Sequence, residues 1–433
     1  MKRILPFVVL LMPLLFLACE EDDSPLVQPV SFEVVVKYSS TYGNQTASNI
    51  KVKALNLDSK IATEATTNAI GVANFENLPV GVYDISVSQT YSPAQFLEFS
   101  GQTVENDVVF NATLTNQTIN VAATKRFELE LASSPVGNLV IKQVYFAGSD
   151  AKDGALFRDQ FIEIHNNSDQ VQYADGICFG QVLGKGGTVK VDPMYLQENG
   201  QYDWSKSLGM TVGNRANTDF VYMESLFQIP GTGTQYPIQP GQSIVIAQNA
   251  LNHKAPYQDQ AGKTITPINP DLTVDLSGAD FEAFYGSTQA SDINNPAVPN
   301  LILLHTYGKD MLFDNPGRDA YVLIKKDPGV ASLPKFPTPD KTTITSATTL
   351  YYQVPVDWVL DAVEVQESST KLLPKKLPNA LDAGYTYVPL GKYSSQSVIR
   401  KVAKTFNGRV ILQDTNNSTN DFRPLDRANP KGF

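Results

Sequence analysis

The sequence predicts an all-β protein built from two β-sandwiches. Three observations support this fold class. Apolar and polar side chains alternate in short runs such as "SFEVVVKY", "GVYDISVSQ" and "RFELELAS", which is typical of strands with one buried face. Clusters of Gly, Asn and Pro, as at 42–44 and 77–79, mark turns between those runs. Few stretches show the spacing of an amphipathic helix.

The amino-terminal segment has the features of a secretory signal. Lys2 and Arg3 precede an apolar run that ends at Leu17, and Ala18 places a small residue before Cys19. The run is too short for a spanning helix, which needs about 20 residues. The segment resembles a bacterial lipoprotein signal, with Phe16 where Leu is commoner. The resemblance implies that residues 1–18 are a signal peptide and that Cys19 carries the lipid.

Four acidic residues follow this cysteine directly and open a short tether at 19–30. They are Glu20, Glu21, Asp22 and Asp23. The run resembles the acidic export signal of Bacteroidota surface lipoproteins, which implies an outer-membrane protein that faces the cell exterior. A generic charged linker is the alternative interpretation.

Residues 31–132 are expected to form the first sandwich. Within them, "TTNAIGVANFENLPVGVYDISV" resembles the carboxypeptidase-regulatory and prealbumin-like sandwiches. The resemblance depends on Gly71, Ala73, Phe75, Leu78, Pro79, Gly81 and Tyr83. It implies a fold and little chemistry, because such modules usually serve as stalks or spacers.

Residues 138–433 are expected to form the second sandwich, with insertions near 183–235, 251–316 and 330–350. Three motifs carry a resemblance to the immunoglobulin-like lamin-tail domain: "LVIKQVY", "FIEIHN" and a Pro-Gly turn before "IVI". The closing segment "SVIR" follows in the same order. The whole layout resembles an uncharacterised family of Bacteroidota surface lipoproteins. Long insertions on a rigid sandwich often carry function.

Composition narrows the class of partners. The formal net charge is −10, so the chain repels polyanions and nucleic acid is not an expected partner. The apolar fraction of 42% suits a folded protein. The two cysteines do not form a disulfide framework, and Cys178 is expected to be a buried small side chain rather than a reactive thiol.

Catalytic motifs are missing from the sequence. The three histidines, His165, His253 and His305, form no spaced metal-binding pair, and no G-x-S-x-G or Walker motif is present. "GKGGT" at 184–188 lacks the strand-to-helix frame of a phosphate loop, so a hairpin loop is expected there. These observations predict a protein that is not an enzyme. A carboxylate-based hydrolase stays as an alternative, since the 44 acidic residues do not select a pair.

Two groups of side chains are candidates for ligand binding. Asp414, Asn416, Ser418 and Asn420 alternate along "DTNNSTND", a spacing that suits calcium, while an Asx-rich turn is the alternative; no other cofactor is expected. Aromatic residues of the insertions could stack on a ligand or could pack the loops, and the candidates are Tyr202, Trp204, Phe281 and Tyr285. Trp204, between Asp203 and Lys206, is the one expected to be most exposed.

Together these features predict a surface-exposed, non-catalytic binding module anchored to the outer membrane by its lipid. By analogy of build, nutrient or ligand capture beside a TonB-dependent receptor is the favoured context. A structural or adhesive cell-surface protein is the alternative from another class.

Overall fold

The computed structural model describes residues 29–39, 42–100, 107–121, 126–135, 137–168, 170–187, 190–286, 289–325, 329–406 and 408–433. Cys19 and the acidic run Glu20 to Asp23 lie outside the described residues. The predicted all-β class is confirmed: the helical elements are short, with α1 at Pro93–Ser100 and α2 at Ser418–Asp421, and the rest is strands and loops. No helix in the described part of the chain is long and apolar enough to cross a bilayer.

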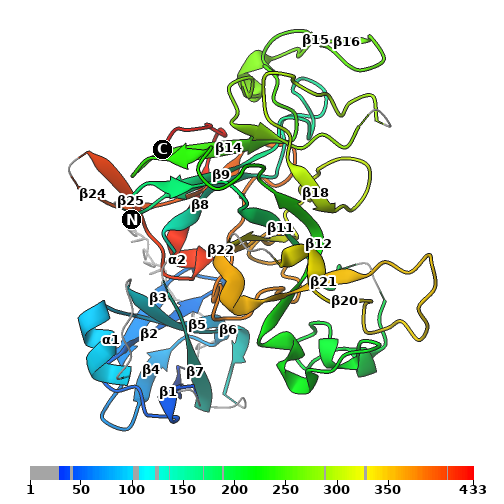
Figure 1. Ribbon diagram of the computed structural model, residues 1–433. Helices are drawn as coiled ribbons and strands as arrows, with labels where there is room; N and C mark the ends of the chain where they lie inside the picture. The colour runs from blue at the N-terminus through cyan, green and yellow to red at the C-terminus, as the bar shows by residue number, and fades with distance from the viewer. Residues whose placement is uncertain are drawn as a thin grey trace, which may run out of the picture.

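The first seven strands form a sandwich at the amino-terminal end of the chain (Figure 1). Their order is β3-β2-β5-β6-β7-β1-β4, and their bounds are β1 Val30–Tyr38, β2 Lys51–Asn56, β3 Ala62–Thr66, β4 Val72–Leu78, β5 Gly81–Tyr91, β6 Val108–Ile119 and β7 Arg126–Pro135. The alternating runs in the sequence correspond to β1, β5 and β7. In β1 the burial alternates as expected, with Phe32, Val34 and Val36 inside.

Aromatic rings fill the core of this sandwich. Phe32 stacks on Phe75 with ring centroids 4.9 Å apart, and helix α1 buries Phe96 against Phe110. The hydroxyl of Tyr83 donates to the carbonyl of Pro79 over 2.7 Å, which ties strand β5 to the Leu-Pro turn before it. The turn motif found in the sequence therefore has a packing role in this structure.

Strands β6 and β7 are neighbours at one end only. The two strands pair between Val108 and Asn111, whereas β7 pairs with β1 in parallel from Arg126 to Leu131. Strand β6 instead continues beside β5 as far as Ile119. The two sheets of the sandwich therefore separate along the second half of β6.

The second region contains two further sheets that enclose a common core. One has the order β17-β14-β9-β8-β23-β26, and the other has the order β20-β21-β12-β11-β19-β22, with β18 on β12. The bounds of the first are β8 Leu139–Tyr145, β9 Phe161–Asn166, β14 Ser243–Ala247, β17 Phe281–Glu282, β23 Ser397–Arg400 and β26 Phe422–Leu425. Those of the second are β11 Cys178–Val182, β12 Phe220–Gln228, β18 Ile302–His305, β19 Ala320–Ile324, β20 Lys335–Phe336, β21 Tyr351–Pro355 and β22 Val359–Glu364.

Short elements complete this region. They are β10 Gln172–Tyr173 paired with β13 Pro237–Ile238, β15 Tyr257–Gln258 paired with β16 Thr264–Ile265, and the hairpin of β24 Val402–Phe406 and β25 Arg409–Leu412. Single turns of 3-10 helix lie at Pro193–Tyr195, Trp204–Lys206, Gly213–Asn217, Pro270–Leu272, Val330–Ser332 and Val356–Trp358.

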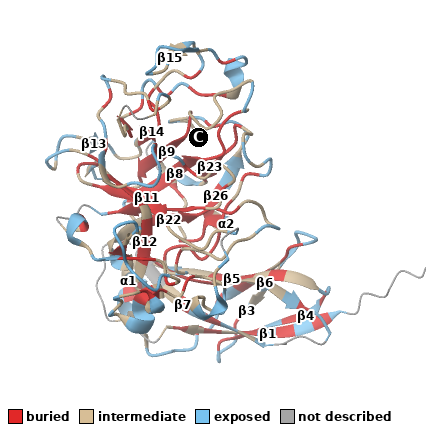
Figure 2. Ribbon diagram, turned by 90° about the vertical axis from the view of Figure 1, so that its right-hand side faces the viewer, coloured by how far each residue is buried: buried red, intermediate tan, exposed pale blue. Residues whose placement is uncertain are grey.

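The central strands of the second region are buried on both faces. Every residue of β8, β9 and β11 is buried, so their sequences cannot alternate (Figure 2). The insertion near 251–316 covers the outer face of the first sheet, where Val274 and Leu276 pack on Tyr145 and Phe161. Leu377 and Leu381 similarly cover the outer face of the second sheet. The segment 251–316 and the segment around 377–381 therefore act as covering layers, whereas the expected insertion 183–235 contains β12, a strand inside the second sheet.

Buried ion pairs lie between and within the two sheets of the second region. Arg400, with 1% of its side chain exposed, pairs with Asp361 at 2.6 Å, Asp414 at 3.2 Å and Asp421 at 3.4 Å. Lys142 pairs with Glu163 at 2.8 Å, and its ammonium lies 3.7 Å from the ring centroid of Phe433. Buried charges are tolerated only when they are paired in this way.

Candidate functional site

A cleft of about 960 Å³ lies between the amino-terminal sandwich and the second region. Residues 113–117 of β6, with Glu130 and Ala132 of β7, line one wall. Residues 197–219 of the first insertion and the segment 366–385 contribute the other walls. In Figure 1 these segments come together beside β6 and β7, below β22. We call this space the inter-sandwich cleft.

Hydrogen bonds fix the two regions on either side of the cleft. The amide of Asn111, a buried residue of β6, donates to the carbonyl of Thr415. The hydroxyl of Tyr385 donates to Asp84 of β5 over 3.4 Å. Burial raises the pKa of Asp84, while the bond from Asn116 opposes this shift. The cleft is therefore a preformed feature, since polar contacts hold both of its sides.

The wall from the first insertion is held by a small aromatic core. Trp204 stacks on Tyr222 of β12, with ring centroids 3.6 Å apart and planes 8° from parallel. Asn217 accepts from the backbone N–H of Trp204 at 2.8 Å and donates to the carbonyl of Tyr202 at 2.7 Å. Asp203 caps the short helix at Trp204–Lys206. These contacts present Gln197 and Asn199 at the cleft surface.

The segment 366–380 forms an apolar floor on a polar frame. Leu372, Leu373 and Pro374 line the cleft, and Gln366 holds them in place by accepting from the N–H of Leu373 at 2.8 Å. Gln201 donates to the carbonyl of Lys375 over 2.6 Å and so joins this floor to the insertion. Burial lowers the pKa of Lys375, against the opposing influence of Asp382 and Glu364.

The lining is mostly uncharged. It contains eight amide side chains and five hydroxyl groups but three side chains with a carboxylate or an ammonium group, Glu130, Asp219 and Lys375. Most of the amides hold the loops, as Gln201, Asn217 and Gln366 do. Asn116 and Gln197 differ, because no hydrogen bond of either side chain occurs within the described residues. An amide that is not engaged can both donate to and accept from a ligand.

The aromatic residues proposed from the sequence pack inside the protein. Tyr202 and Trp204 are 6% and 5% exposed, so the expectation that Trp204 is exposed is wrong. The physical reason is Tyr222, whose ring offers a stacking partner that the sequence did not reveal. Phe281 is buried in the main core, and Tyr285 packs against it. Burial raises the pKa of the Tyr285 hydroxyl.

Two of the four side chains proposed for calcium, Asp414 and Ser418, are used in other contacts, whereas the buried side-chain nitrogen of Asn416 has no hydrogen-bond partner among the described residues. Asp414 pairs with Arg400, and Ser418 donates to Asp382 over 2.5 Å. The neighbouring Asn417 caps α2 by accepting from Thr419 and Asn420. Asn416, whose φ is 49°, occupies a turn. Within the described ranges no three His, Cys, Asp or Glu side chains gather as a metal site. This segment therefore has the geometry of an Asx-rich turn.

The three histidines and Cys178 pack among other residues of the fold. His165 contacts Ser243 at 3.0 Å and the carbonyl of Val410 at 3.1 Å, and burial lowers its pKa to about 4. Cys178 is buried in a hydrophobic cluster on β11, as expected. His253 is buried, and burial lowers its pKa. His305 lies on β18, where its ring meets the edge of Tyr352.

Two carboxylates with raised pKa values, those of Glu224 and Asp292, lie outside the cleft. Burial raises the pKa of Glu224 to about 8, and the nearby charge of Asp319 adds to the shift. Burial likewise raises the pKa of Asp292 to about 7. Neither residue lines the cleft, whose carboxylates are Glu130 and Asp219 on different walls.

The sequence analysis did not identify the residues that line the cleft. The amide-rich runs "TLTNQT" and "QENGQ" were the visible signals of them in the sequence.

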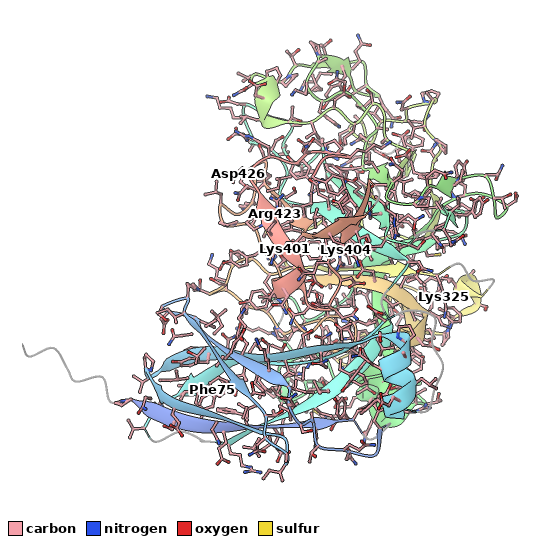
Figure 3. All side chains as sticks on the ribbon, turned by 90° about the vertical axis from the view of Figure 1, so that its left-hand side faces the viewer. Phe75, Lys325, Lys401, Lys404, Arg423 and Asp426 are labelled. Atoms are coloured by element: carbon pink, nitrogen blue, oxygen red, sulfur yellow. The ribbon has the colours of Figure 1, made fainter. Side chains whose placement is uncertain are left out.

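Basic side chains gather near the carboxyl-terminal hairpin. Figure 3 shows Lys401 and Lys404 next to each other, with Arg423 close by, above the amino-terminal sandwich. Among the described residues, these three make no ion pair within 4.0 Å. Lys401 donates to the carbonyl of Asn420 over 2.5 Å. None of these three residues lines the inter-sandwich cleft.

Fold and site together define an all-β protein with a preformed, nearly neutral cleft between two β-regions. The profile of the family described as "Protein of unknown function (DUF4876)" matches residues 239–429. The chain is similar to the crystal structure of a DUF4876 family protein from Bacteroides thetaiotaomicron VPI-5482. That similarity has a TM-score of 0.50 and 24% identity, and it covers 91% of this chain and 95% of that one. It supports the fold.

Two further solved structures show partial similarity. A candidate carbohydrate binding protein from Pseudomonas aeruginosa has a TM-score of 0.17 and 19% identity, over 24% of this chain and 89% of that one. Fervidolysin from Fervidobacterium pennivorans, a keratinolytic enzyme related to subtilisin, has a TM-score of 0.18 and 15% identity, over 51% and 27%. No curated protein matches the chain.

Proposed function

We propose that this chain is a lipid-anchored binding protein on the outer surface of a bacterial outer membrane, and that it captures its ligand in the inter-sandwich cleft. The main observation that supports the proposal is the cleft itself. Its volume of about 960 Å³ is at the upper end of the range for ligand sites, and both regions of the chain contribute to it. A site between two regions is a frequent place for ligand binding.

The chemistry of the lining favours binding over catalysis. Its carboxylates, Glu130 and Asp219, lie on different walls, and Glu224 and Asp292, whose pKa values are raised by burial, do not line it. A general acid and base would have to lie within reach of one reacting bond. Amides, hydroxyls and an apolar floor instead provide hydrogen bonds and contact area for a neutral ligand.

The proposed location rests on the segment Leu14 to Asp23. Cys19→Ser is expected to release the protein from membranes, because the lipid is its only anchor in this proposal. Alanine in place of Glu20 to Asp23 should keep the lipid but leave the protein on the periplasmic face. Fractionation and protease shaving of whole cells measure the two effects. Membrane sedimentation of the serine variant after a salt wash would contradict the anchor.

In this setting the protein delivers its ligand to a TonB-dependent receptor in the same membrane. Affinity purification of the intact lipoprotein, followed by mass spectrometry, should recover such a receptor in near-equal amount. A cleft-filling variant, Ala380→Trp, tests the site, since Ala380 is a half-buried cleft residue in a turn. The wild type should gain thermal stability from its ligand, and the variant should not. Equal stabilisation of both proteins would place the ligand elsewhere.

A further inference from the structure

Strand β6 has an open edge where it faces the inter-sandwich cleft. Its pairing with β5 extends from Tyr91↔Val108 to Gly81↔Ile119. On its other edge, pairing with β7 among the described residues covers only Val108 to Asn111. Among the residues that the structure describes, the stretch 112–119 therefore has one edge without a strand neighbour. Such an edge presents unpaired backbone N–H and C=O groups and is a ready template for another strand.

The open edge lies in the cleft rather than on an outer surface. Thr113, Leu114, Thr115, Asn116 and Gln117 all line it. The side chain of Gln117 donates to the backbone carbonyl of Thr115 over 2.7 Å. This local bond occupies the carbonyl oxygen of Thr115. An N–H group of an added strand could replace the Gln117 side chain as the donor to that oxygen. Strand β6 has a bulge near Asn116, whose φ is 55° and whose backbone N–H already donates to Asp84 over 2.8 Å. The edge between Thr113 and Gln117 is therefore kinked.

We propose that the inter-sandwich cleft takes an extended polypeptide segment, which pairs as an added strand with the open edge of β6. This inference rests on the proposed function, because it names the ligand class of the same cleft. Strand addition is an established way of recognising peptides, with main-chain hydrogen bonds for affinity and side-chain contacts for specificity.

The surroundings of the edge suit a peptide backbone. Asn116 and Gln197 offer amide groups that are not engaged within the described residues, and an amide can bond to both the N–H and the C=O of a peptide. Leu372, Leu373 and Pro374 give an apolar floor for alternate side chains of the strand. The few charges in the lining favour a segment with neutral side chains.

A carbohydrate fits the lining less well. Sugars are commonly held by stacking on an exposed aromatic ring. Tyr385 is the aromatic residue of this cleft lining, it is 7% exposed, and its hydroxyl is bonded to Asp84. The aromatic rings of the first insertion pack on one another behind the wall. Without such a platform, the hydrogen-bonding edge is the main recognition element.

The test uses the full mature chain and a random hexapeptide library displayed on phage. Peptides enriched on the wild type are synthesised and titrated calorimetrically against wild type, Asn116→Ala/Gln197→Ala and a control, Asn214→Ala. Asn214 is an exposed amide of the same insertion that does not line the cleft. The double variant should bind about thirtyfold more weakly, which corresponds to the loss of two hydrogen bonds of about 1 kcal/mol each. The control should bind like the wild type.

Backbone methylation then separates strand addition from other binding. Each peptide is made in two forms, with N-methyl groups on odd or on even residues. An added strand donates only alternate N–H groups to its neighbour, so one form should lose binding and the other should keep most of it. Equal binding by both methylated forms would contradict strand pairing. Neutral glucose oligosaccharides are titrated in parallel.

The outcomes distinguish this inference from the proposed function. Binding of an oligosaccharide that Ala380→Trp abolishes, with no enriched peptide, would overturn the inference and leave the cleft as the ligand site. Peptides whose binding is unchanged by Ala380→Trp and by the Asn116/Gln197 double variant would overturn both. Peptide binding with alternate sensitivity to methylation and with loss in both cleft variants would support both.

Discussion

Trp204→Ala should destabilise the first insertion and its wall of the cleft. The indole is 5% exposed and stacks on Tyr222 with ring centroids 3.6 Å apart. A buried aromatic side chain covers about 200 Å², which at about 25 cal/mol per Å² gives about 5 kcal/mol. Measured losses for buried Trp→Ala changes are about 3–5 kcal/mol. We therefore expect the free energy of unfolding to fall by about 4 kcal/mol.

The assay combines thermal unfolding followed by circular dichroism with limited proteolysis. At roughly 2 °C per kcal/mol for a region of this size, the midpoint should fall by about 8 °C. If the insertion opens by itself, new cleavage between 190 and 219 should appear instead. Met194→Ala is the matched control, because Met194 is 58% exposed in the same insertion. An unchanged midpoint together with unchanged cleavage would refute the packing role of Trp204.

Two further predictions concern folding and pH. Residues 29–135 expressed alone should show a β-type spectrum and one cooperative transition, since a continuous hydrophobic cluster lies within that range; a disordered spectrum would mean that this sandwich needs its neighbour. Asp292→Asn should raise stability at pH 8 by on the order of 1 kcal/mol or more and leave it unchanged near pH 4. Burial raises the pKa of Asp292 from 3.8 to about 7, so the folded protein holds a proton that the unfolded chain has lost, and stability falls as the pH rises through this window. Denaturant titrations at both pH values measure the difference, and equal gains at both would show that the proton is not involved.

The alternation of apolar and polar residues predicted the strands that have one buried face and one exposed face. The alternation in "SFEVVVKY" identified β1 because one face of that strand is buried and the other is not. The same reasoning could not foresee that all of β9 is buried, since its second face is covered by the insertion near 251–316. When a segment that is distant in the sequence covers a strand, the sequence shows no periodic pattern of apolar residues that would predict this contact.

The candidate site illustrates the same limit. Trp204 looked exposed because its sequence neighbours are polar, yet its ring partner, Tyr222, lies on a strand 18 residues away in the chain. The cleft is formed by β6, the first insertion and the segment 366–385, three parts that are far apart in sequence. The separation of β6 from β7 depends on strand register, which composition alone does not determine.

The affinity of one enriched peptide for the wild type and for Ala380→Trp tests the central claim most directly. Ala380 lines the inter-sandwich cleft from a turn, so the indole can enter the cleft without disturbing a strand. Calorimetric titration of both proteins, with equal melting midpoints as the condition for comparison, gives the ratio of the two affinities. If the cleft is the ligand site, the variant should bind at least about tenfold more weakly, equivalent to about 1.4 kcal/mol. Equal affinities would contradict the account.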